Sequence, residues 1–206
     1  MSNLVVKSPA DMVNMGLRRI GYKLRVGSLY DGSNAAKVAL DIYSQTRDEL
    51  FAASDYGFCE RNVNLTLLKS APANGYFPPN NWNPATNPPP PWLFEYTYPA
   101  DCLKVRAVKP QPTFVLDPDP QPWVFAVEND VGYDPPAKVI LCNVANALLV
   151  YTGQVTDPLD WEPGFVEEFA AALAERLAPQ LANLDAAKLE AADEQQEHQK
   201  SMQERG

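Results

Sequence analysis

The sequence predicts an α+β fold, a helical bundle of N-terminal helices and a C-terminal helix with a small antiparallel β-lobe inserted between them. Apolar residues recur at helical spacing near both ends of the chain, and β-branched and aromatic runs separated by turn-forming residues occupy the middle. With 206 residues and 46% hydrophobic content, one core and a smaller lobe can form. We expect the N-terminal helices in residues 1–55, the β-lobe in 56–155, and the C-terminal helix with its tail in 156–206.

Two helices are predicted near the N-terminus. Ser8 is placed to cap the first helix, and Pro9 and Asp11 suit its first turn. Gly21 marks its end. A turn-rich segment follows, and Ser33 is the expected cap of a longer amphipathic helix that reaches about residue 53.

The middle of the chain is predicted to form β-strands. Residues 62–67 alternate between apolar and polar, which favours a strand, with a helix as the open alternative. Five further strands are expected, and the turn residues between them indicate an antiparallel meander. These strands are residues 93–98, 103–108, 123–128, 138–142 and 148–155.

A proline-rich loop is predicted at residues 72–91, which hold eight of the twenty prolines, so no regular element can form there. Trp82 lies within this loop and Trp92 directly follows it. They are candidate anchors for a partner surface, and the equally weighted alternative is that they fix the loop to its own domain.

A C-terminal helix is predicted from the spacing of Phe165, Phe169 and Leu177, with Pro179 expected to kink or break it. The tail from residue 184 favours helix by composition but has few apolar residues, so we expect it to become ordered on assembly. Its large apolar side chains are candidate interface residues, namely Leu184, Leu189 and Met202.

Composition argues against several classes of function. The net charge is −9, which disfavours tight nucleic-acid binding, and no leader or membrane span is expected. Phosphate-binding glycine motifs, zinc motifs and the serine-hydrolase motif are missing from the sequence, so no cofactor and no metal are expected. His198, the single histidine, lies in the polar tail, and Cys59, Cys102 and Cys142 are expected to be free thiols.

Charged clusters offer little catalytic potential. Asp117 with Asp119, and Asp157 with Asp160, are the best carboxylate pairs, and both are read as turn residues. The basic cluster, at the end of the first helix, is expected to complement the helix dipole rather than to contact phosphate. It comprises Arg18, Arg19, Lys23 and Arg25.

Five segments follow one another along the chain in a characteristic order. Ile20-Gly21 and the turn Ser28-Leu-Tyr-Asp-Gly-Ser33 are followed by a helix that ends Tyr43-Ser-Gln-Thr-Arg-Asp-Glu-Leu50. Next comes the aromatic segment Tyr96-Thr-Tyr-Pro-Ala-Asp-Cys-Leu103. The last is Tyr151-Thr-Gly-Gln-Val-Thr-Asp-Pro158, with Phe165 and Phe169 of the following helix. In this order, the segments resemble the head-to-tail adaptor family of tailed bacteriophages, also called tail tubular protein A.

This resemblance covers residues 8–182 and implies a structural virion protein without enzymatic activity. It implies a homo-oligomeric ring, usually a dodecamer, that docks beneath the portal protein, meets a tail or nozzle protein, and lets DNA pass through without sequence-specific binding. The location it implies is the neck of the virion, after assembly in the host cytoplasm. A ring of about twelve copies at −9 each would carry roughly −100 in all, and an acidic wall repels DNA.

Three other interpretations stay open. The first is a tail-completion or nozzle-type component elsewhere in the virion. The second, from a different class and less favoured, is a carboxylate-dependent hydrolase of cell-wall glycans. The third, a DNA-binding terminus protein, is disfavoured by the acidic charge.

Overall fold

The computed structural model describes residues 8–73, 75–76, 82–111 and 122–203, with the backbone alone for 184–203. It contains three α-helices and two antiparallel β-sheets, which confirms the mixed α+β class. Contacts between Cα atoms divide the chain into two compact units. Residues 1–50 with 155–206 form one, here called the helical unit, and residues 51–154 form the other, here called the β unit.

Local capping fixes the starts of the first two helices as predicted. Helix α1 spans Pro9–Arg19, and the Ser8 hydroxyl accepts a hydrogen bond from the Asp11 N–H at 3.2 Å while donating to the Asp11 carboxylate at 2.9 Å. Helix α2 spans Asn34–Ala53, and the Ser33 hydroxyl accepts from the Ala36 N–H at 3.2 Å.

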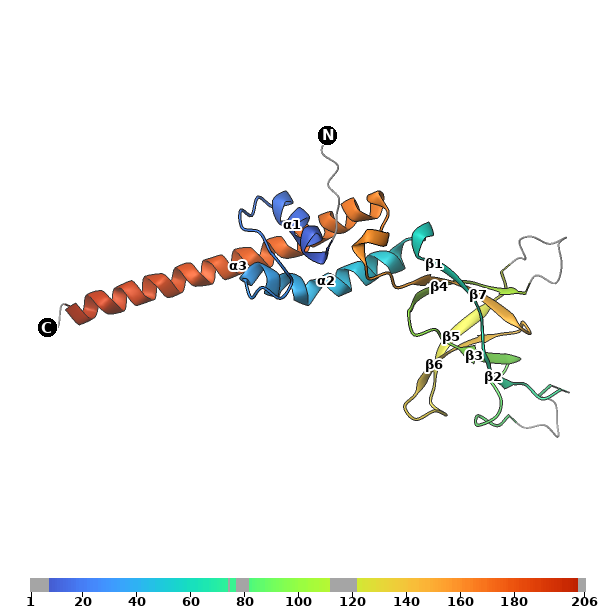
Figure 1. Ribbon diagram of the computed structural model, residues 1–206. Coiled ribbons are helices and arrows are strands. Elements are labelled where there is room, and N and C mark those ends of the chain that lie inside the picture. The colour runs from blue at the N-terminus through green and yellow to red at the C-terminus, as the bar shows by residue number, and fades with distance from the viewer. Residues whose placement is uncertain (1–7, 74, 77–81, 112–121, 204–206) are drawn as a thin grey trace. The chain divides into compact units, whose positions relative to one another are not determined.

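Helix α3 spans Pro163–Gln203 as one continuous element that includes Pro179. Of the kink or break predicted at Pro179, the break is therefore wrong. A proline inside a helix removes one backbone hydrogen bond and costs about 3 kcal/mol. Leu177 and Leu181 are buried on either side of it, so packing of this turn offsets the loss. Figure 1 shows α1 and α2 beside the first half of α3, which continues beyond both.

Aromatic rings form the core of the helical unit. The ring centroid of Phe169 lies 5.0 Å from that of Tyr43, 5.1 Å from that of Trp161 and 5.9 Å from that of Phe165. Helices α1 and α3 approach closely at Gly16, where a Cβ would lie 3.3 Å from the Leu173 Cβ. A larger residue at this position would force the two helices apart.

The described residues of the β unit form seven strands. The single strand predicted over residues 62–67 is in fact two, β1 (Glu60–Asn64) and β2 (Leu67–Ser70), which belong to different sheets. The other five strands are confirmed, and none of their ends is shifted by more than two residues. They are β3 (Phe94–Thr97), β4 (Cys102–Pro110), β5 (Phe125–Asp130), β6 (Ala137–Cys142) and β7 (Ala147–Gly153).

Strand pairing does not follow a meander. One sheet has the order β1-β7-β4 and the other β2-β3-β6-β5, all antiparallel, so that consecutive strands β3 and β4 lie in different sheets (Figure 1). The meander is therefore wrong. Alternating sequence specifies which side chains share a face, but it leaves open which strands become neighbours.

Both sheets contribute to one apolar core. Tyr96 and Ile140 from the four-stranded sheet belong to the same buried cluster as Val108 and Leu149 from the three-stranded sheet. The Tyr96 hydroxyl donates to the Val144 carbonyl at 2.7 Å, which satisfies its polar end inside this core. Side chains on the other face of the four-stranded sheet consequently point away from the core, and this outer face carries the candidate site.

No helix in the described part of the chain has a stretch long and apolar enough to cross a membrane. Cys59, Cys102 and Cys142 are buried and form no disulfide with one another, as predicted. Burial raises the pKa of the Cys102 and Cys142 thiols, which makes them poor nucleophiles.

Candidate functional site

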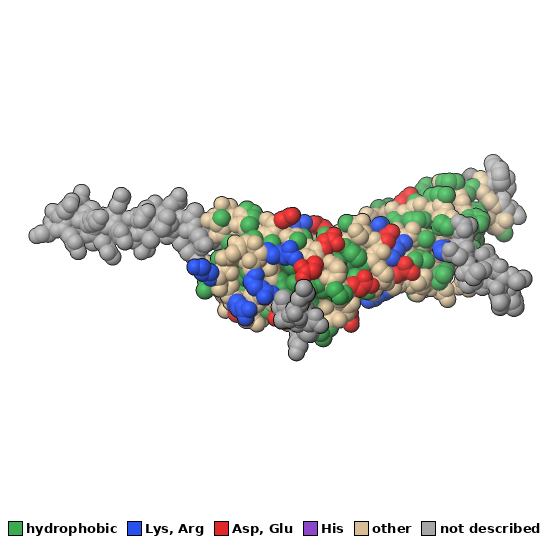
Figure 2. Space-filling view, turned by 90° about the horizontal axis from the view of Figure 1, so that it is seen from above, with side chains coloured by type: hydrophobic (Ala, Val, Ile, Leu, Met, Phe, Trp, Pro, Cys, Tyr) green, Lys and Arg blue, Asp and Glu red, His purple; other side chains and the backbone are tan. Residues whose placement is uncertain are grey.

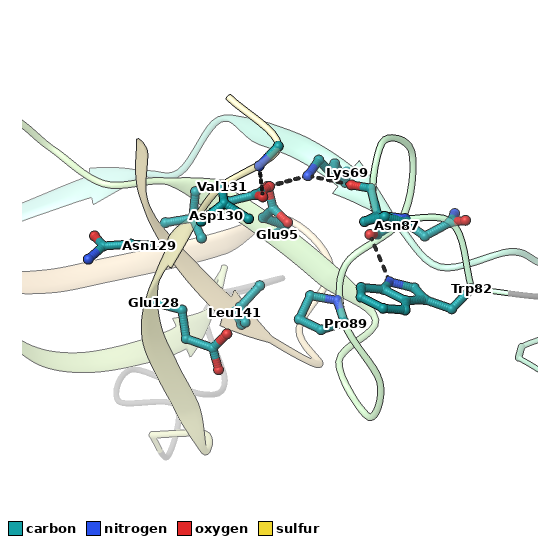
Figure 3. A pocket seen from close by; sticks show the side chains of 13 residues that line it. Lys69, Trp82, Asn87, Pro89, Glu95, Glu128, Asn129, Asp130, Val131 and Leu141 are labelled. Atoms are coloured by element: carbon teal, nitrogen blue, oxygen red, sulfur yellow. Dashed lines mark hydrogen bonds and ion pairs between the residues drawn. The ribbon is translucent and has the colours of Figure 1, made fainter. Parts of the chain in front are cut away.

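A cavity of about 410 Å³ lies in the β unit between the outer face of the four-stranded sheet and the proline-rich loop. This volume lies within the range typical of small-ligand sites. Figure 3 shows Trp82 and Pro89 on one side of it, Leu141 at its base, and Glu128 and Asp130 on the other side. Strands β2, β3, β5 and β6 supply most of the remaining lining.

Strand register explains why these side chains share a face. Glu95 of β3 lies opposite Lys69 of β2 on one side and Leu141 of β6 on the other. Leu141 in turn lies opposite Ala126 of β5. Because residues directly opposite each other in a sheet point to the same side, this row crosses the outer face. Glu128 of β5 is two residues from Ala126 and joins the same face.

Lys69, Glu95 and Asp130 form a charged cluster at the inner end of the cavity. The Lys69 ammonium lies 3.4 Å from the Glu95 carboxylate, pairs with Asp130, and donates to the Pro84 carbonyl at 3.0 Å. The Lys69 and Glu95 side chains are 8% and 1% exposed. An ammonium group has three N–H donors, and three acceptors surround this one.

Burial separates the pKa values of the two carboxyls. Burial is the main cause that raises the pKa of Glu95, and Lys69 only partly opposes it. Burial also acts to raise the pKa of Asp130, but the hydrogen bonds from Lys69 and the Gly132 N–H outweigh it and lower that pKa. The pKa of Lys69 is raised, because its contacts with Asp130 and Glu95 outweigh its own burial. Asp130 is therefore the stable anion of the cluster.

Hydrogen bonds hold the proline-rich loop over this face. Besides the bond from Lys69 to Pro84, the Asn87 side-chain amide donates to the Ser70 carbonyl at 2.9 Å. The Trp82 indole N–H donates to the Asn87 carbonyl at 3.4 Å, and Trp82 is still 48% exposed. These hydrogen bonds attach the proline-rich loop to strand β2, and the ring of Trp82 lies at the mouth of the cavity.

This arrangement suits binding better than acid–base catalysis. Glu95, the carboxyl with the raised pKa, lines the cavity but is only 1% exposed and contacts Lys69, so little of it is accessible to a substrate. The exposed groups at the mouth are the Trp82 indole, the Glu128 carboxylate and Val131, which is 83% exposed. They offer an aromatic face, one negative charge and apolar surface.

The predicted interface residues have different environments. Trp82 lines the cavity, whereas Trp92 is half-buried outside it, with its backbone N–H bonded to the Pro89 carbonyl at 3.0 Å. Leu184, Leu189 and Met202 lie in helix α3, and their side chains fall outside the described residues. The same holds for the side chain of His198.

Of the two predicted carboxylate pairs, Asp157 with Asp160 lies among the described residues. Asp157 caps a short 3-10 helix, Pro158–Asp160, by accepting from the Leu159 N–H at 3.0 Å, which agrees with its interpretation as a turn residue. Asp117 and Asp119 lie outside the described residues. No group of three His, Cys, Asp or Glu side chains in the described ranges is placed to hold a metal ion.

The basic cluster is exposed on the helical unit. Arg19 pairs with Glu167 of α3, while Arg18 donates to the Asn14 carbonyl at 3.2 Å near the end of α1. Lys23 and Arg25 lie in the exposed segment that follows. Figure 2 shows Lys and Arg side chains gathered in one area of this unit, whereas Asp and Glu side chains are spread along the face in view.

Sequence reasoning missed Lys69, Glu95 and Asp130. Each is a charged residue in a strand, which alternation places on the outer face, where charge is ordinary. Their burial depends on the proline-rich loop that covers that face, and no local pattern reveals such cover. The closest signal is Glu95 itself, a lone acid in the aromatic strand Phe94–Thr97.

Comparison with models of known protein families and with curated protein sequences gives no match.

Proposed function

We propose that the chain is a non-enzymatic subunit of the head-to-tail connector of a tailed bacteriophage, which forms a ring beneath the portal protein. We also propose that its helical unit is a bundle into which the β unit is inserted. The helical unit would dock to the portal, and the β unit with its proline-rich loop would face the tail or nozzle protein. This proposal begins from the sequence resemblance, and the structure adds physical support.

The observation that carries the proposal is that the resembling segments supply key packing and turn contacts of both units. In the turn Ser28–Ser33, the Asp31 carboxylate accepts from the N–H groups of Gly27 at 2.8 Å and Ser33 at 2.9 Å. In the segment from Tyr43 to Leu50, Tyr43 packs on Phe169. Such contacts are typical of residues that define a fold rather than a catalytic centre.

The same holds in the β unit. Asp101, from the segment Tyr96–Leu103, accepts from the Tyr151 hydroxyl at 3.2 Å and pairs with Arg61. Tyr151 opens the next resembling segment, so the two segments meet directly. Cys102 is buried beside them. Two of the five resembling segments are therefore joined across the β4–β7 pair.

Helix α3 supports a docking role. Its described contacts with α1 and α2 lie in its first half, where Arg176 donates to Thr46 at 3.0 Å and pairs with Glu49 of α2. The helix then continues to Gln203. Leu184, Leu189 and Met202 lie on that second half, where a groove on the portal would offer the apolar contacts that order such a segment.

Electron microscopy of the protein mixed with the portal protein of the same phage tests the proposal. We expect rings of this chain stacked coaxially on portal rings. Separate particles under all assembly conditions would contradict the adaptor role. Rings that bind only a tail protein would favour the alternative of a tail-completion or nozzle component, and clearing of cell-wall glycan by the purified protein would favour the hydrolase.

The acidic charge gives the proposed ring a second testable property. If acidic residues face the channel, they repel the phosphate backbone, so DNA slides through without adhering. Particles whose lumen-facing acids are replaced by amides should then eject or retain DNA abnormally. Unchanged packaging and ejection would contradict an electrostatic role for the channel wall.

A further inference from the structure

We propose that the cavity between the proline-rich loop and strand β5 binds a Lys or Arg side chain of a partner protein, presented on an extended segment that pairs with the free edge of β5. This inference does not rest on the proposed function. It rests on the charge balance of the cavity, its aromatic mouth and the sheet edge beside it.

Charge balance favours a cationic guest. Three carboxylates line the cavity, from Glu95, Glu128 and Asp130, and a single ammonium, from Lys69, accompanies them. That ammonium is shared between Glu95 and Asp130 inside the cavity. Glu128 is exposed at the mouth on the same face of β5 as Asp130. An anionic guest would meet the carboxylate of Glu128 first, whereas a cation would be attracted.

The remaining lining fits the stem of a long basic side chain. Val139 and Leu141 are buried at 1% exposure each and form an apolar base, and Pro89 adds an apolar wall. Lys and Arg bury their methylene stems against such surfaces while the charged head stays near a carboxylate. Trp82, held through its indole N–H, presents its ring at the mouth, where a cation gains a further attraction (Figure 3).

Strand β5 supplies the place where the partner backbone binds. It is the last strand of its sheet and pairs only with β6 among the described strands, so one of its edges is unpaired. An extended segment added to this edge would place alternate side chains on the face of Glu128 and the others beside Val127, which is 37% exposed. The matching segment therefore alternates basic and apolar residues.

Fluorescence anisotropy with a short labelled peptide, Thr-Val-Lys-Val-Lys-Val-Thr, tests the inference on the full chain. We expect this peptide to bind about tenfold more tightly than one with Glu in place of both Lys. Glu128→Gln and Trp82→Ala should each weaken binding about threefold or more. Glu162→Gln, a matched loss of an exposed acid on the helical unit, should leave binding unchanged.

A peptide N-methylated at alternate backbone amides tests the strand pairing separately. It keeps its side chains but loses the backbone N–H groups that would donate hydrogen bonds to the edge of β5. We expect this peptide to lose binding. Any one of four results would overturn the inference. They are equal binding of the Lys and Glu peptides, insensitivity to Glu128→Gln and to Trp82→Ala, unimpaired binding of the N-methylated peptide, and no binding of the Lys peptide up to about 1 mM.

Discussion

Replacing Lys69 by Met should destabilise the β unit strongly, because it removes the cation from a buried cluster that holds two carboxyls. Breaking a buried ion pair on one side costs about 3–5 kcal/mol. We expect a value near the lower end, about 3 kcal/mol, because the Asp130 side chain keeps 15% exposure and its bond from the Gly132 N–H at 2.7 Å. The loop would also lose the bond from Lys69 to Pro84.

Hydrogen exchange at the amides of β3 and β6 is the appropriate assay, since it reports the stability of this unit within a chain of two units. The matched control is Lys69→Met combined with Glu95→Gln, in which the carboxyl that lost its partner becomes a neutral amide. We expect this double variant to recover about 1 kcal/mol or more.

The pH dependence has a definite sign. Burial raises the pKa of Glu95 above its value in the unfolded chain, so between these two values the folded state holds a proton that the unfolded state has released. Stability therefore falls as pH rises through this window. Loss of Lys69 removes an effect that lowers the pKa of Glu95, so it widens the window and enlarges the fall.

A loss below about 1 kcal/mol in Lys69→Met, or the same loss in the double variant, would refute a stabilising role of this cluster.

Three further predictions concern the helical unit. Phe169→Ala should lower its free energy of unfolding by about 3–5 kcal/mol, because the ring contacts Tyr43 and Trp161 in the core, and a loss under about 1 kcal/mol in urea denaturation would contradict this packing. The Asp31 carboxyl should titrate with a pKa of about 2 by NMR, because hydrogen bonds from Ser33 and Gly27 stabilise its anion, and an ordinary value would show that this turn is not formed in solution. Truncation after Asn183 should leave a folded protein that no longer docks to the portal, whereas normal docking of the truncated chain would exclude the end of α3 from the interface.

Features decided by neighbouring residues were predictable from the sequence. The Ser8 and Ser33 caps depend on hydrogen bonds within one helical turn, and both form as predicted. Strand positions also followed from composition and turns. The break predicted at Pro179 was wrong because the local rule for proline does not include tertiary packing. The buried neighbours Leu177 and Leu181 override that rule.

Features decided by distant segments were not predictable. The pairing of β3 with β6 joins residues more than forty positions apart, and alternation within each strand is compatible with several partners. The buried Lys69–Glu95 contact requires that pairing and the covering loop together. Trp82 could be singled out as a large aromatic in a polar loop, but its position at a cavity follows only from the folded loop.

The mass of the complex formed with the portal protein tests the central claim most directly. Mass photometry of purified portal rings should show an added mass of about twelve times 22.8 kDa when this chain is present, and none with the chain truncated after Asn183. Portal rings whose mass is unchanged by the full-length chain would contradict the proposed adaptor function.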